Sequence, residues 1–228
     1  MTRIILSIIA VFLLSGFSVP TPLKKVKDDY LALRESIEKE RIQTAHLYTE
    51  HLISMEEVGH IFTDNFVTNI IPQWIGTPWS QDGKSFYPQQ GSINDSYFVM
   101  TTLLHMGIRL NRYDYARKSA LKQAETIKLE HHLINYQGSS DSFFKECQTH
   151  YDYGIYFLTI EDYVGFLYID KDDEFYFIYT SHTQEEEQVI MKNVEECSFL
   201  KGDLTATMVP ISTNYSLMEY WLSNKNIP

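Results

Sequence analysis

The chain has 228 residues, with 30 acidic and 19 basic side chains and a formal net charge of −11 at pH 7. This length favours a single domain with a sizeable core. The surplus of negative charge excludes nucleic acid as an expected partner, because phosphate contacts need a basic surface. It also argues against docking on anionic lipid.

Residues 1–18 have the pattern of a signal peptide. Arg3 gives a positive start, residues 4–14 form an apolar run, and small residues follow it. The run is shorter than the roughly 20 residues of a membrane span, so no stable span is expected; an uncleaved signal anchor is the alternative. The pattern predicts export to the periplasm or the extracellular space. In an oxidising compartment, Cys147 and Cys197 could form a disulfide.

The first half of the chain is helical in pattern. Residues 19–53 carry apolar side chains at spacings of three and four, with charged ones between them. This predicts an amphipathic N-terminal helix that packs on its own domain or on a partner. Ser54 and Glu57 form a capping-box pattern that predicts the start of a second helix, and Pro72 with Gly76-Thr77-Pro78 predicts its end. Residues 113–131 predict a further helix.

The stretch 91–107 predicts a buried helix that follows a polar loop at 80–91. Asn94 and Asp95 signal the N-cap, because such side chains accept a backbone N–H of the first turn, and Gly107 signals the end. Helix N-termini favour anions and lower the pKa of a thiol. The start of this helix is therefore a natural place for chemistry.

The second half changes to a strand-like pattern rich in Tyr, Phe and Ile. The predicted strands are 154–160, 164–170, 174–181, 189–191 and 205–211. A short helix capped by Ser140 or Asp141 is expected to run through Cys147, and Asn214 is expected to cap a terminal helix over 215–222. Helices followed by an antiparallel sheet of about five strands predict an α+β fold.

Three segments carry a resemblance to a known family: residues 74–79, the stretch 91–99 and the strand pair 154–166. Together they resemble the NlpC/P60-like, papain-like cysteine amidases and peptidases of bacterial envelopes. The resemblance covers roughly residues 70–212 and implies that residues 54–228 form a papain-like α+β domain.

The resemblance implies a nucleophilic Cys at the N-terminus of the buried helix and a His that opens a strand just before Val164-Gly165-Phe166. It also implies a polar third residue on the next strand, and substrates that are often peptidoglycan peptides. This sequence departs from the pattern at each position. Asp95 stands at the nucleophile position, Tyr163 at the base position and Tyr179 at the third.

These replacements remove the chemistry of the family. A carboxylate at a helix N-terminus is a weak nucleophile toward amides, and a phenol with a pKa of about 10 is a poor general base. Asp95 is expected to cap the helix and to occupy the backbone donors that would otherwise receive an oxyanion. The cysteine-amidase mechanism is therefore expected to be absent.

The same positions predict a binding site instead of a catalytic one. We expect the binding residues to be Trp79, Asp95, Ser96, Tyr163 and Tyr179. No cofactor and no metal are expected. The ligand class stays open between a peptide, a glycan and a protein.

Other candidate sites are weaker. Cys147 and His150 have the spacing of a thiol–imidazole pair or of half a zinc site, but a helical Cys and a surface His are favoured because no second half-site follows. His182 could reach the pocket, although an exposed loop residue is favoured. An acidic pair of Asp95 with Glu161 or Asp162 could support acid–base hydrolysis, but acidic residues are plentiful enough for chance proximity.

Three functions follow from these observations. The favoured one is an exported, catalytically inactive papain-like domain that binds a peptide, cell-envelope or protein ligand. The first alternative is an active cell-envelope amidase or peptidase with relocated catalytic residues. The second is a partner-binding envelope protein that acts through its N-terminal helix.

Overall fold

The computed structural model describes residues 22–160, 163–183 and 186–228, and the predicted signal peptide at 1–18 lies outside them. The helices are α1 (Pro22–Thr49), α2 (Met55–Asn65), the π-helical turn η1 (Phe66–Ile70), α3 (Ile71–Trp74), α4 (Asp95–His105), α5 (Arg112–Ala116), α6 (Ala120–Ile127), α7 (Ser140–His150), the 3-10 turns η2 (Val194–Glu196) and η3 (Ser198–Leu200), and α8 (Tyr215–Leu222). The strands are β1 (Ile134–Ser139), β2 (Gly154–Ile160), β3 (Tyr163–Ile169), β4 (Phe175–Thr180), β5 (Val189–Asn193) and β6 (Asp203–Pro210).

The described strands form one six-stranded antiparallel sheet in the order β1-β6-β2-β3-β4-β5. The predicted α+β class is confirmed, but the expectation of about five strands is wrong by one. The missed strand is β1, which lies at the edge of the sheet beside β6. Its sequence, INYQGS, is mostly polar and contains Gly138, so it lacks the apolar signal of a strand.

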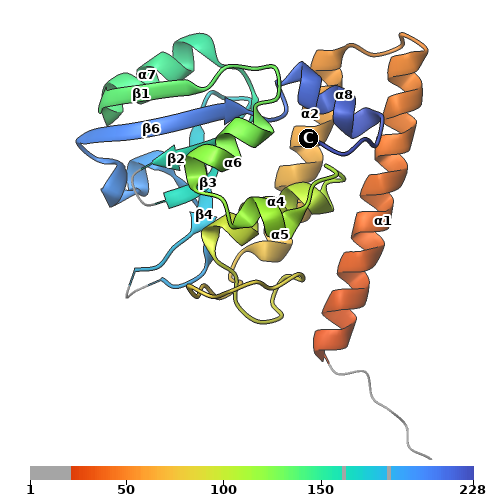
Figure 1. Cartoon of the computed structure of the whole chain (residues 1–228), viewed down its shortest axis with the longest axis horizontal. Helices are drawn as coiled ribbons and strands as arrows, with labels where there is room; N and C mark the ends of the chain where they lie inside the picture. The colour runs from red at the N-terminus through yellow and green to blue at the C-terminus, as the bar shows by residue number, and fades with distance from the viewer. Residues whose placement is uncertain (1–21, 161–162, 184–185) are drawn as a thin grey trace, which may run out of the picture.

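Helices cover both faces of the sheet. In Figure 1, α1 runs along the right-hand edge, the sheet lies on the left, and α2, α4, α5 and α8 lie between them, whereas α7 lies beside β1. Neighbouring residues of the strands point into two separate cores. The core on the side of α2, α4 and α8 includes Ile155, Phe157, Phe166, Ile178 and Val209. The core on the side of α7 includes Phe143, Cys147, Tyr156, Leu158, Leu167 and Phe177.

The starts of α2 and α8 follow the predicted capping signals, but α7 is capped by Ser139, whose side chain accepts the Ser142 N–H, and not by the predicted Ser140 or Asp141. The capping box is confirmed: the Ser54 backbone N–H donates to Glu57 Oε2 at 2.7 Å, and the Glu57 N–H donates to Ser54 Oγ at 3.2 Å. Asn214 caps α8 as predicted. The predicted helix 113–131 is instead two helices, α5 and α6, because Ser119 begins a new one by accepting the Lys122 N–H.

The amphipathic N-terminal helix packs on its own domain. Tyr30 and Ile37 of α1 are buried. Arg41 donates from Nη1 to the backbone oxygens of Trp221 and Leu222, at 3.1 and 2.9 Å. These carbonyls lie in the last turn of α8, and the Trp221 oxygen also accepts the Asn224 N–H at 3.1 Å. The apolar face of α1 is therefore already in use, and any partner would have to bind its other side.

Candidate functional site

Asp95 is the first residue of α4, and its half-buried carboxylate points toward the end of β4. Its Oδ1 accepts hydrogen bonds from Trp79 Nε1, at 3.0 Å, and from the hydroxyl of Thr180. The N-cap is Asn94, whose side chain accepts the Tyr97 N–H at 3.0 Å. The expectation that Asp95 caps the helix is therefore wrong. Asn94 has the extended backbone of an N-cap, and this frees Asp95 to reach the sheet.

The chain segment before the loop positions Trp79. The Gly76 N–H donates to the Val189 carbonyl at 2.9 Å, and the Trp79 N–H donates to the Glu187 carbonyl at 2.8 Å. Gly76 has a φ of 81°, a conformation that glycine adopts without strain. The segment 76–79 thus runs beside β5, which places the Trp79 indole next to the carboxylate of Asp95.

An aromatic cluster, defined as Trp79, Tyr163, Tyr179, His182 and Phe199, extends from this carboxylate. The His182 imidazole stacks on the Tyr163 ring, with centroids 4.7 Å apart, and lies 5.3 Å from the Trp79 ring. Tyr163 also stacks on Phe199 at 4.2 Å and meets Tyr179 edge-on at 5.4 Å. Tyr179 is buried, whereas the other four are partly exposed. A surface of aromatic rings therefore adjoins Asp95.

The structure brings together four of the five expected binding residues: Trp79, Asp95, Tyr163 and Tyr179. The fifth, Ser96, is engaged elsewhere, because its hydroxyl lies 2.8 Å from Nε2 of Gln123 on α6. Whether the four bind a ligand stays a prediction. The sequence analysis missed Phe199, and it favoured His182 as an exposed loop residue, whereas the structure shows it half-buried and stacked on Tyr163. His182 follows β4 by two residues, which was the one signal that could have placed it beside the site.

Burial sets the electrostatics of Asp95. It raises the pKa of the carboxyl, while the hydrogen bonds from Thr180 and Trp79 and the nearby His182 oppose that rise. Burial also raises the pKa of Tyr179. A half-buried carboxyl that accepts two hydrogen bonds is suited to orienting neighbouring groups or to exchanging a proton, and not to attacking an amide.

Neither cysteine has the character of a nucleophile. Cys147 and Cys197 are both buried free thiols. Burial raises the pKa of Cys147 to about 12 and also raises that of Cys197, so both stay protonated near neutral pH. His150 is exposed, with Nδ1 3.0 Å from the Glu146 carbonyl oxygen. Within the described ranges, no group of His, Cys, Asp or Glu is arranged to hold a metal.

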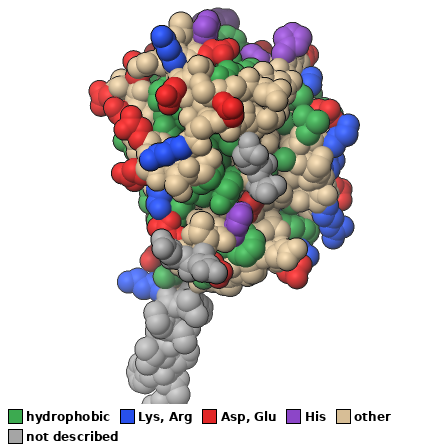
Figure 2. All heavy atoms as spheres, turned by 90° about the vertical axis from the view of Figure 1, so that its left-hand side faces the viewer, with side chains coloured by type: hydrophobic (Ala, Val, Ile, Leu, Met, Phe, Trp, Pro, Cys, Tyr) green, Lys and Arg blue, Asp and Glu red, His purple; other side chains and the backbone are tan. Residues whose placement is uncertain are grey.

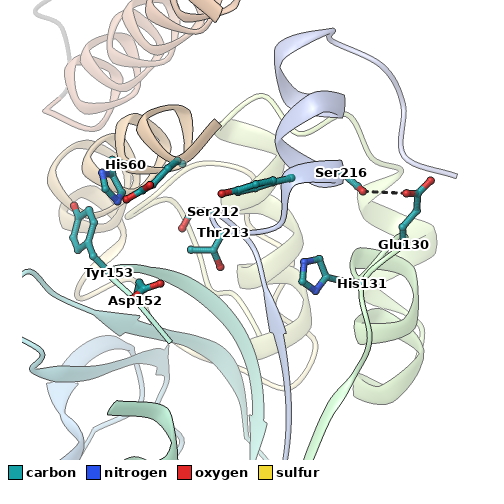
Figure 3. A pocket seen from close by; sticks show the side chains of 11 residues that line it. His60, Glu130, His131, Asp152, Tyr153, Ser212, Thr213 and Ser216 are labelled. Atoms are coloured by element: carbon teal, nitrogen blue, oxygen red, sulfur yellow. Dashed lines mark hydrogen bonds between the residues drawn. The ribbon is translucent and has the colours of Figure 1, made fainter. Parts of the chain in front are cut away.

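A cavity of about 570 Å³ lies apart from the aromatic cluster, between α2, α8 and the start of β2. Figure 3 shows His60 and Tyr153 on one side of it, His131 and Glu130 on the other, and the 3.5 Å hydrogen bond between Ser216 and Glu130. The acidic side chains that line it are Glu56, Glu130 and Asp152, and all three are exposed. The cavity is negative in character, but its carboxylates stay hydrated, so it offers no built site.

The predicted acidic pair of Asp95 with Glu161 or Asp162 involves residues 161–162, which lie outside the described residues.

Comparisons with protein-family models, curated proteins and solved structures find no match. Among the helices of the described ranges, none has the length and apolar composition that crossing a membrane requires.

Replacing Asp95 with asparagine is expected to change how stability depends on pH. An acid whose pKa is raised by folding contributes most below its unfolded pKa, and this contribution is lost as pH rises through the folded pKa. Asparagine keeps the acceptor oxygen for Trp79 and Thr180 but cannot ionise. Measured by urea unfolding from about pH 3 to pH 7, the stability of the variant relative to the wild type should rise with pH. The same substitution at exposed Asp82 is the control, and a pH-independent difference at Asp95 would contradict the assignment.

Proposed function

We propose that this chain is an exported binding domain on a cysteine-amidase-like frame, which holds a peptide-bearing envelope ligand at the aromatic cluster and does not cleave amides. One observation carries the proposal. A cysteine amidase would hold its thiolate in the first turn of α4. This chain instead holds Asp95 there, and its carboxylate accepts hydrogen bonds from Trp79 and Thr180. The signal-peptide pattern of residues 1–18 supports export, and the segments 74–79, 91–99 and 154–166 support the frame.

The cluster has the properties of a binding surface. Trp79, Tyr163, His182 and Phe199 are partly exposed, and aromatic side chains of this kind supply large contact area at low entropic cost. On the face shown in Figure 2, hydrophobic side chains are exposed next to a histidine and an acidic side chain. A ligand that stacks on the rings and donates a hydrogen bond to Asp95 fits this arrangement.

Soluble peptidoglycan fragments are the probe that tests binding. Trp74 and Trp221 are fully buried, so a change in tryptophan fluorescence on adding fragments reports mainly on Trp79. Replacing Tyr163 with alanine is expected to weaken binding at least about 10-fold, because it removes the ring that links His182 to Phe199. Tyr215→Ala removes an exposed ring far from the cluster and should leave binding unchanged. Equal affinity of wild type and Tyr163→Ala would contradict the proposal.

A second candidate is acid–base hydrolysis by Asp95 and His182. It is favoured by their proximity, since His182 is close enough to lower the pKa of the Asp95 carboxyl. Incubation of the protein with intact peptidoglycan decides between the two. Released peptides that disappear in both Asp95→Asn and His182→Gln would establish hydrolysis and refute the binding-only function, whereas we expect no release.

A further inference from the structure

The two edges of the sheet differ in how the chain covers them. At the β5 edge, the segment 76–79 pairs with the strand. The Gly76 N–H donates to the Val189 carbonyl, and the Val189 N–H donates to the Thr77 carbonyl, both at 2.9 Å. At the other edge, β1 pairs with β6 on one side, and none of the residues that the structure describes pairs with its other side. Figure 1 shows β1 as the outermost strand there, so its outer edge is open.

Helix α7 covers a face of the sheet and not this edge. β1 and β2 both run antiparallel to β6, so they are parallel to each other, and α7, which connects them, crosses over β6. The buried residues Phe143 and Cys147 of α7 accordingly share a core with Ala206 and Met208 of β6. The backbone groups on the outer side of β1 are therefore left to solvent.

The register shows which backbone groups these are. Ser140, one residue beyond β1, is in register with Gly202, and its N–H donates to the Gly202 carbonyl at 2.8 Å. In an antiparallel pair, opposite residues alternate between exchanging hydrogen bonds and not exchanging them. Counting back in steps of two, Tyr136 also bonds to β6, so the N–H and C=O groups of Asn135 and Gln137 point away from it.

This edge carries none of the features with which proteins usually block edge-to-edge pairing, which are charged side chains, proline and bulges. The sequence of β1, INYQGS, has no charged residue and no proline, and its register with β6 is continuous, without a bulge. The whole chain has a net charge of −11. Two copies therefore meet with less repulsion at this neutral edge than at a charged surface.

The flanks of β1 favour an antiparallel second copy. A two-fold axis at Tyr136 places Asn135 opposite Gln137 of the second copy, and both have outward-facing backbone groups. The same register brings His131, which precedes the strand, toward Asp141 of the second copy, at the start of α7. Both side chains are exposed. A protonated imidazole at one flank thus faces a carboxylate at the other, whereas a parallel pair would align like with like.

We propose that two copies of this chain associate through β1, which joins their sheets into one continuous antiparallel sheet across a two-fold axis. Asn135 and Gln137 of each copy exchange backbone hydrogen bonds with Gln137 and Asn135 of the other. An open edge with unpaired backbone groups is a template for such pairing. The interface lies at the opposite edge of the sheet from β5, so it does not depend on the aromatic cluster or on the function proposed there.

Sedimentation analysis of the full chain tests the proposal. We expect a dimer whose fraction rises with protein concentration between about 1 and 100 μM, as for a small interface. Gln137→Pro is expected to weaken dimerisation at least about 10-fold, because proline removes an outward N–H that the pairing with β6 does not use. Gln137→Ala keeps that N–H and should change the dimer dissociation constant less than about twofold. A monomer at about 100 μM, or equal association of wild type and Gln137→Pro, would overturn the proposal.

A second measurement needs no variant and covers the case in which Gln137→Pro fails to fold. In hydrogen exchange of the wild type, the amides of Asn135 and Gln137 should exchange more slowly as the protein concentration rises. The amide of Tyr136 is protected by β6 at every concentration and serves as the internal control. Exchange at Asn135 and Gln137 that does not depend on concentration would refute pairing through β1.

Discussion

Replacing Phe166 with alanine is expected to lower the free energy of unfolding by about 3–5 kcal/mol, the cost of removing a large buried ring. Phe166 lies on β3 and is 0% exposed. Its ring meets that of Phe66 at 4.8 Å and that of Phe98 at 6.1 Å. It therefore fills the space where the helical layer meets the sheet, and alanine would leave a cavity there. Urea unfolding followed by circular dichroism measures the change.

Tyr215→Ala is the matched control, because that ring is 55% exposed and its loss should change stability by less than about 0.5 kcal/mol. If Phe166→Ala costs no more than this control, α4 does not pack on β3 as described. The consequence would extend to the candidate site, because the contact of Phe98 with Phe166 holds α4 where Asp95 meets Thr180.

Local signals were sufficient to predict the helix starts at Ser54 and Asn214, because capping depends on side chains within three residues of the cap. They were insufficient for β1. That strand is held by its pairing with β6, about 70 residues later, and its own residues have little preference for a strand. The two-sided burial of the sheet explains why the central strands show continuous apolar runs and lack the alternation of half-exposed strands.

The candidate site was likewise predictable from the sequence only in part. Trp79, Asp95, Tyr163 and Tyr179 were expected near one another through the resemblance, and the structure places them together, although their role in binding is untested. Phe199 was not expected, because it belongs to η3 and reaches Tyr163 only through tertiary packing. The capping role given to Asp95 belongs to its neighbour. Single-residue shifts of this kind depend on backbone angles that a residue pattern does not determine.

Replacing Gly59 with alanine is expected to cost about 3 kcal/mol of stability, at the upper end of what overpacking produces. Gly59 is buried on α2, and a Cβ added there would lie 2.3 Å from the backbone oxygen of Ser212. A backbone atom cannot move aside as a side chain can. Ser212 is held in turn, since its Oγ accepts the Ile155 N–H at 2.9 Å. The substitution therefore has to push α2 away from the turn that leads into α8.

The sign of this effect makes the test decisive. At an open helix position, changing glycine to alanine stabilises a protein by about 1 kcal/mol, because alanine loses less conformational freedom on folding. Ser36→Ala, at an exposed position of α1, is the control and should change stability by less than about 0.5 kcal/mol. A stabilised Gly59→Ala variant in urea unfolding would mean that α2 and Ser212 are not in contact. The helical layer would then be assembled differently from the arrangement in Figure 1.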